Sequence, residues 1–188
     1  MPSLYIVRHG ESQSQVDPSV CGINPDLSQK GVSQSIALKN VFDKLTPDLV
    51  LLSPLKRAYH TFLLSELNCK NVKFDGRLLE GEWEGAPSYS EDIYEGLSAV
   101  ATIENLKWHE QSVDSRVSSL VEHLHHLHLD SVALFSHSGT INLMLKLLLN
   151  VSQHDKTWFQ IENSSITKIE LKDGSSFMTS FNDSTHLN

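Results

Sequence analysis

Leu4-Tyr5-Ile6-Val7-Arg8-His9-Gly10-Glu11-Ser12 is the stretch around which the rest of the chain can be interpreted. Its apolar run, residues 4–7, has the length and composition of a buried parallel strand. The run ends at Arg8 and His9, which would stand at the carboxyl end of the strand, where open α/β sheets bind ligands. A guanidinium beside an imidazole suits an oxyanion, because Arg offers a planar fork of donors and His can act as a nucleophile or an acid/base. The alternative is a strand that simply ends in a surface charge.

A second stretch repeats this design near the other end of the chain. Residues 131–136 are mostly apolar and are followed directly by His137. A helix is predicted after them, at 141–149. Two histidines at strand ends would face each other across one pocket. The N-terminus of the helix after Ser138 would direct backbone N–H groups and its positive dipole end towards an anion. Together the two stretches predict an anion site built from histidine and arginine.

Motifs in order along almost the whole chain resemble those of the histidine phosphatase superfamily, which has the phosphoglycerate mutase-like fold. They are Arg8-His9-Gly10-Glu11-Ser12, Asp26-Leu27-Ser28-Gln29-Lys30-Gly31, Ser53-Pro54-Leu55-Lys56-Arg57-Ala58, Ser136-His137 and the tail 181–187. The resemblance implies a three-layer α/β/α fold with a mostly parallel central sheet. It also implies a single domain over residues 1–188, with a small cap insertion around 81–111.

The remaining elements are predicted from apolar spacing and from residues that cap helices or form turns. Helices are expected at about 29–44, directly after Ser53, and at about 113–129; strands are expected at 49–52, 72–74, 158–161, 165–171 and 176–181. Ser28 and Ser53 are the expected N-caps of the first two helices. The last two strands flank Lys172-Asp173-Gly174, a turn signal, so the C-terminal part is expected to add antiparallel edge strands.

Composition sets limits on the functional class. A chain of 188 residues, 39% of them hydrophobic, suits one domain with a sizeable core. It shows no apolar run near the roughly 20 residues of a membrane span and no signal-peptide pattern, so a cytoplasmic location without membrane partners is expected. Cys21 and Cys69 are too few for a disulfide framework. The formal net charge of −8 argues against general nucleic-acid binding.

The resemblance implies roles for the strand-end residues. His9 would attack phosphorus and form a phosphohistidine, while Arg8, Arg57 and His137 would bind the phosphoryl oxygens. Arg57 is expected in the first turn of a helix, where a lone cation opposes the helix dipole and is easier to explain beside an anion. Cationic side chains would then do the work that a metal does elsewhere, so no metal or cofactor is required.

The proton donor is harder to locate. Many relatives place several residues between the acidic donor and a Gly-x-Trp-Glu-Gly motif, whereas here that motif directly follows Glu80. Either the segment is shortened or the donor has moved. Glu80 follows a predicted strand and is the first candidate. Glu82, in the motif Gly81-Glu82-Trp83-Glu84-Gly85, is the second. In an extended segment the two carboxylates would point to the same side. The resemblance therefore leaves both as candidates for the general acid.

Four positions depart from the family pattern or carry weaker signals. Gln15 stands where mutase-like members often carry an Asn that donates to phosphate, and it is either such a donor or a solvated loop residue. Cys21 and Gly22 would line the pocket from the same loop. Ser138 stands where relatives usually have Gly; its N–H can still donate, although its Cβ would crowd the phosphate.

A cluster of four histidines, residues 123, 125, 126 and 128, raises the possibility of a metal site. Their spacing divides them over two faces of the predicted helix, and neither a nearby Cys nor a His-Glu-x-x-His pattern accompanies them. A solvated helix face is the preferred interpretation.

Three functions remain compatible with the sequence. The first is a phosphomonoester phosphatase acting on a small molecule, with phosphoprotein substrates left open. The second is a cofactor-dependent phosphoglycerate mutase, and the third is a non-catalytic module that binds a phospho-ligand or a protein. The stretch between Glu80 and His137 is short compared with mutases, which favours the phosphatase. The presence of both histidines and both arginines disfavours the binding module.

Overall fold

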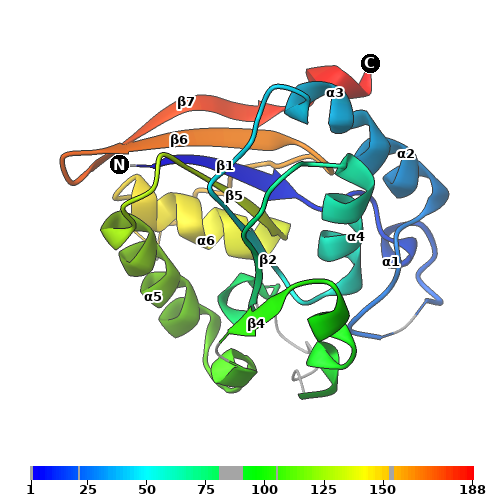
Figure 1. Cartoon of the computed structure of the whole chain (residues 1–188). Helices are drawn as coiled ribbons and strands as arrows, with labels where there is room; N and C mark the ends of the chain where they lie inside the picture. The colour runs from blue at the N-terminus through cyan, green and yellow to red at the C-terminus, as the bar shows by residue number, and fades with distance from the viewer. Residues whose placement is uncertain (1, 21, 81–90, 105, 153–154) are drawn as a thin grey trace.

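The computed structural model describes residues 2–20, 22–80, 91–104, 106–152 and 155–188. Within them one sheet runs in the strand order β4-β3-β2-β5-β1-β6-β7 (Figure 1). The strands are β1 Ser3–Arg8, β2 Leu49–Leu52, β3 Val72–Asp75, β4 Thr102–Glu104, β5 Ser131–Ser136, β6 Ile166–Lys172 and β7 Ser175–Asp183. Neighbours from β4 to β1 pair in parallel, whereas β6 and β7 pair antiparallel. The predicted mostly parallel sheet with antiparallel strands near the C-terminus is confirmed.

Helices cover both faces of this sheet and make the three-layer α/β/α arrangement. They are α1 Gln13–Val16, α2 Gln29–Ala37, α3 Lys39–Phe42, α4 Lys56–Ser65, α5 Val113–His126 and α6 Ser138–Leu148. Because successive strand residues point to opposite faces, Leu4 and Ile6 pack with α5 and α6. Val7 instead packs on the side of α2, α3 and α4. The alternation explains why β1, buried on both faces, reads as one continuous apolar run.

Three of the expected helices and strands need correction. Residues 158–161 form no strand; Asn142 exchanges hydrogen bonds with the backbone of Phe159, and Ile161 O accepts from Arg8, so those groups are satisfied without strand pairing. The helix expected at 29–44 is interrupted at the buried Leu38, which separates α2 from α3. The helix expected to reach 129 ends at His126, because the backbone of Leu127 is extended.

Of the two serines expected to cap helices, one does so and the other does not. The Ser28 hydroxyl accepts a hydrogen bond from Gly31 N at 3.0 Å and caps α2 as expected. Ser53 does not cap α4: the N-cap position belongs to Leu55, and the helix begins at Lys56. Ser53 precedes a proline, which favours an extended backbone rather than a helix start. Its hydroxyl is used elsewhere, as described below.

The described part of the segment expected to form the cap contributes to the sheet. Residues 91–104 and 106–110 contain three short 3₁₀ helices, η2 Glu91–Tyr94, η3 Leu97–Ala99 and η4 Leu106–Glu110, together with β4, which pairs in parallel with β3. Ile93, Tyr94 and Leu97 are buried and join the core on the α4 side of the sheet. Two further 3₁₀ helices are η1 Gly76–Leu78 and η5 Thr185–Leu187. Among the described residues, no helix has the length and apolar character needed to cross a membrane.

Candidate active site

The two histidines stand together because three parallel strands end at the same level. In the register of β1 and β5, Arg8 lies beside Ser136, and His9 N donates to Ser136 O at 3.0 Å. Ser53 N, just past the end of β2, donates to Phe135 O at 3.0 Å. The residues after each strand therefore meet at one carboxyl edge, as expected for a binding site in an α/β sheet.

His9 is held with one ring nitrogen protonated and the other facing a cation. It is 3% exposed, and its Nδ1 lies 2.6 Å from Gly10 O, which can only accept, so Nδ1 carries the proton. Nε2 accepts from Arg57 Nε at 3.3 Å. Burial holds the pKa of His9 well below its usual value, and the charges of Arg57 and Arg8 lower it further. The ring is therefore neutral at neutral pH, with a lone pair available on Nε2.

His137 faces His9 from the end of β5. The two ring centroids lie 5.1 Å apart with 55° between the ring planes. His137 is fully buried, and its Nε2 lies 2.7 Å from Ser53 Oγ. Burial, followed by the charge of Arg57, holds the pKa of His137 well below its usual value. Two neutral imidazoles thus share one side of the site.

Glu80 completes the group with a carboxylate. A ring nitrogen of His9, a ring nitrogen of His137 and a carboxylate oxygen of Glu80 lie within 4.8 Å of one another. Glu80 Oε1 accepts from Gly139 N at 3.0 Å and Thr140 N at 3.3 Å, the N–H groups of the second and third residues of α6. The expected anion at this helix N-terminus is thus supplied by the protein itself, which suits the positive end of the helix dipole. Glu82, the second candidate acid, lies outside the described residues.

Arg8 and Arg57 flank the histidines. Arg8 is half-buried at the end of β1, and its Nη1 donates to Ile161 O at 2.5 Å. Burial lowers the pKa of Arg8, with Glu80 opposing and Arg57 reinforcing this shift. Arg57 is buried in the first turn of α4, and its Nη1 donates to Ile23 O at 3.2 Å. His9, Glu80 and His137 are also types of side chain that bind metals, but two guanidinium groups beside them make the site suit an anion better.

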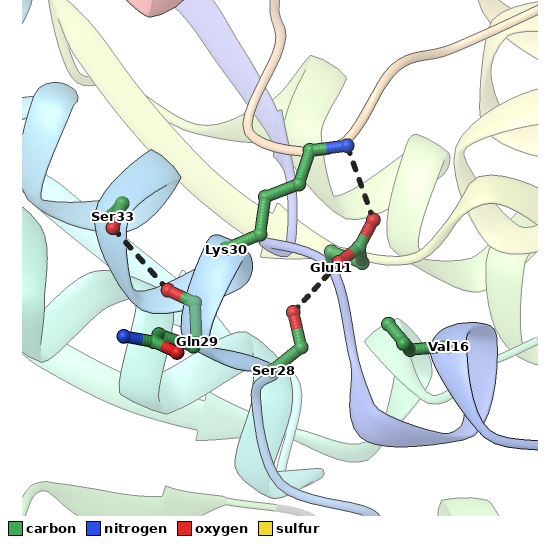
Figure 2. A pocket seen from close by; sticks show the side chains of 6 residues that line it. All are labelled: Glu11, Val16, Ser28, Gln29, Lys30 and Ser33. Atoms are coloured by element: carbon green, nitrogen blue, oxygen red, sulfur yellow. Dashed lines mark hydrogen bonds and ion pairs between the residues drawn. The ribbon is translucent and has the colours of Figure 1, made fainter.

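The turn after His9 is held by contacts with α4 and with the N-terminal end of α2. Gly10 N donates to Thr61 Oγ1 at 2.9 Å. The Glu11 carboxylate accepts from Ser28 Oγ at 2.8 Å and pairs with Lys30 Nζ at 3.3 Å, beside a surface hollow of about 560 Å³ (Figure 2). Gly31 is required here, because a Cβ at that position would lie 2.0 Å from Glu11 O. These contacts make the turn carrying His9 a packed feature of the fold.

The weaker candidates are placed as follows. Gln15 is exposed; its Oε1 accepts from Ser12 N at 3.0 Å, and its Nε2 donates to Asn163 Oδ1 at 3.3 Å. Gly22 is exposed with a φ of +122°, a conformation that favours glycine. Ser138 is half-buried at the first position of α6. Cys21 lies outside the described residues. For all four, contact with substrate stays a prediction.

Sequence reasoning missed three residues that support the histidines. Ser53 binds His137, Thr61 holds Gly10, and Asn163 Nδ2 donates to His9 O at 3.0 Å. Ser53 had a signal, since it directly follows a strand, but a serine before a helix is also the pattern of an N-cap. Thr61 and Asn163 lie 52 and 154 positions from His9 in the sequence. No local pattern connects them to it.

The four histidines at and just after the end of α5 do not form a ligand group. The side chains at 123, 125, 126 and 128 are all exposed, as the preferred interpretation requires. Across the part of the chain that the structure describes, the group of three potential ligands that comes together is His9, Glu80 and His137.

Comparisons with known proteins find relatives that match nearly the whole chain. Phosphoserine phosphatase 1 of Hydrogenobacter thermophilus is 28% identical over 201 residues, covering 100% of this chain and 95% of that protein. The adenosylcobalamin/α-ribazole phosphatase of Escherichia coli is 25% identical over 184 residues, 89% of each chain. The crystal structure of the α-ribazole phosphatase from Shigella flexneri superposes with a TM-score of 0.72 at 24% identity, covering 97% of this chain and 96% of that one.

The two curated relatives are named as phosphatases, and the solved structure shares the fold over nearly its whole length. The model of the histidine phosphatase superfamily, branch 1, matches residues 4–184, from the second residue of β1 to just past the end of β7. With two strand-end histidines, two arginines and a carboxylate gathered at one sheet edge, the chain belongs to branch 1 of the histidine phosphatase superfamily.

Proposed function

We propose that the protein is a phosphomonoester hydrolase that works through a phosphohistidine on His9 and requires no metal. The observation that carries this proposal is the state of His9: a buried, neutral imidazole whose Nε2 faces the Arg57 guanidinium, with His137 and Glu80 alongside. A nucleophile must be deprotonated to attack. Burial first, and the charges of Arg57 and Arg8 after it, hold the pKa of His9 low. The same two guanidinium groups would attract the phosphorylated substrate.

The first half-reaction transfers the phosphoryl group to His9. Arg57 and Arg8 bind the phosphoryl oxygens, so the Arg57 Nε–H moves from the His9 lone pair to an oxygen of the substrate. His9 Nε2 then attacks phosphorus, and the bond between phosphorus and the ester oxygen breaks. Because charge develops on the equatorial oxygens in this step, fixed cationic donors are the main source of stabilisation.

Glu80 completes the first half-reaction as the general acid: it gives the proton of its carboxyl group to the departing alkoxide and becomes a carboxylate. The second half-reaction then releases phosphate. The same carboxylate accepts a proton from a water molecule, which attacks phosphorus as the phosphorus–nitrogen bond breaks. Inorganic phosphate leaves, and His9 is neutral again. His137, paired with Ser53, binds a phosphoryl oxygen throughout.

Trapping the intermediate tests the nucleophile. After brief exposure to a labelled phosphomonoester, the wild type should carry phosphate that is labile to acid and stable to base, and His9→Ala should carry none. His125→Ala, which removes an exposed histidine of α5, is the matched control and should retain the label. Label that persists in His9→Ala would show that another residue is the nucleophile.

The substrate class that we propose is a small phosphorylated metabolite. Three relatives are named for small substrates, phosphoserine, α-ribazole phosphate and glucosyl-3-phosphoglycerate. A phosphate-release screen with these three esters and with phosphohistidine and phosphotyrosine peptides, each with and without EDTA, tests the class and the metal independence together. Preference for a peptide would contradict the substrate class, and loss of activity in EDTA would contradict the metal-free mechanism.

A further inference from the structure

Four consecutive carbonyl groups, from Arg77 to Glu80, are each held by a side chain from another element. Ser136 Oγ, at the end of β5, donates to Leu78 O at 2.9 Å, and Thr140 Oγ1 of α6 donates to Leu79 O at 2.5 Å. The other contacts come from Arg116 on α5. Arg77, Leu78 and Leu79 are buried, so their carbonyl groups need hydrogen-bond partners. Here those partners are side chains of β5, α5 and α6, which fix the position of this segment relative to the site.

Arg116 makes three of these contacts. Its Nη1 donates to Leu79 O at 2.6 Å and to Arg77 O at 3.3 Å, and its Nη2 donates to Glu80 O at 2.6 Å. The side chain is 1% exposed, among the largest that are fully buried in this protein. The planar fork of a guanidinium can hold two neighbouring carbonyls in one fixed arrangement, which the single ammonium of lysine cannot reproduce.

A buried arginine is a poor choice for stability alone. Removing a cation from water is unfavourable, and apolar residues of similar volume often serve a core equally well or better. Ordinary packing therefore gives no reason for a guanidinium between α5 and the end of η1. The segment that Arg116 holds ends at Glu80, whose carboxylate accepts from two N–H groups in the first turn of α6.

We propose that Arg116 is a positioning residue: it holds the backbone of Glu80 so that the carboxyl group reaches the leaving oxygen beside His9. The Glu80 side chain is fixed at its far end by α6, and its backbone is fixed by Arg116. Both ends are needed, because a carboxyl group displaced by about 1 Å can lose roughly 10²-fold in rate. The inference rests on the proposed function, in which Glu80 is the general acid.

The dependence of rate on the leaving group separates this role from a purely structural one. An alkyl phosphate needs its leaving oxygen protonated, whereas p-nitrophenyl phosphate scarcely does. Arg116→Lys should therefore lower the ratio of the alkyl kcat to the p-nitrophenyl kcat by roughly 10- to 100-fold. Glu80→Gln should lower the same ratio, and Arg116→Lys added to Glu80→Gln should change it little further, because the two residues act on one step.

Arg77→Lys is the matched control. Arg77 is also a buried arginine of this region, but its guanidinium pairs with Asp75 and Ser119 O. Its replacement should lower the Tm without changing the ratio. If Arg116→Lys lowers both rates equally, as Arg77→Lys would through loss of folded protein, Arg116 is structural and the inference is wrong. If Glu80→Gln leaves the ratio unchanged, the acid assigned under the proposed function is wrong instead.

Discussion

The two buried histidines predict how the stability of the protein depends on pH. Burial and the neighbouring arginines hold the pKa of both His9 and His137 well below 6.5 in the folded state. In the unfolded chain each returns to about 6.5. Between the folded and unfolded values the unfolded state binds more protons than the folded state. Stability is therefore fully present above pH 6.5 and is lost as pH falls through that value.

The magnitude follows from linkage. For a histidine that stays neutral in the folded state down to pH 5.5, acidification from pH 7.5 to 5.5 lowers the free energy of unfolding by about 1.4 kcal/mol. Two such histidines contribute about 2.7 kcal/mol. That is a large share of the roughly 5–15 kcal/mol that stabilises a typical domain.

Urea unfolding at the two pH values measures this loss. Other titrating groups also contribute, so the quantity to compare is the loss in the wild type minus the loss in each variant. His9→Asn should reduce the loss by about 1.4 kcal/mol, and His9→Asn with His137→Asn should reduce it by about 2.7 kcal/mol. The buffers must lack phosphate, since an anion bound between the arginines would favour protonated histidine.

His125→Asn is the control for removal of a histidine from an exposed face. The reasoning is refuted if the double variant loses as much stability on acidification as the wild type does. In that case the two imidazoles are protonated in the folded state at pH 5.5. His9 would then not be kept ready as a nucleophile by its surroundings, and the ground for the proposed mechanism would be lost.

Three further outcomes are expected. With phosphoglycerate and its bisphosphate supplied, release of free phosphate should exceed exchange between isomers, because the stretch between Glu80 and His137 is short; faster exchange would favour the mutase. Glu82→Gln should change alkyl and p-nitrophenyl turnover by a similar small factor, and a selective loss on the alkyl ester would make Glu82 the acid. Gly31→Ala should lower the free energy of unfolding, measured by urea titration, by about 1–3 kcal/mol, because its Cβ would clash with Glu11 O. Alanine otherwise favours a helix over glycine, so equal or higher stability would contradict this expectation.

The strands and their ends could be predicted from the sequence because the signals are local. An apolar run that stops at Arg8-His9 or at Ser136-His137 carries both the strand and its polar end in a few residues. Parallel pairing then places such ends at one edge of the sheet, whichever strands lie between them. The structure agrees: β1 and β5 are neighbours, and their histidines face each other.

The supporting contacts could not be predicted in the same way. Ser53 has one sequence pattern and two compatible uses, as a cap for α4 or as a partner for His137, and only the spatial arrangement decides between them. Asn163 supports His9 from the far end of the chain. Arg116 resembles any arginine on a helix until the carbonyls of residues 77–80 are seen around it.

The N-terminus of α6 is another feature that the sequence predicts only in part. The sequence predicts that its N–H groups meet an anion, and the physical argument is sound, since a helix N-terminus favours negative charge from any source. Phosphate and a carboxylate satisfy the same donors, so the argument cannot distinguish them. In the structure, Gly139 N and Thr140 N donate to the Glu80 carboxylate. In the proposed mechanism the helix therefore fixes the acid, and the phosphoryl oxygens depend on Arg8, Arg57 and His137.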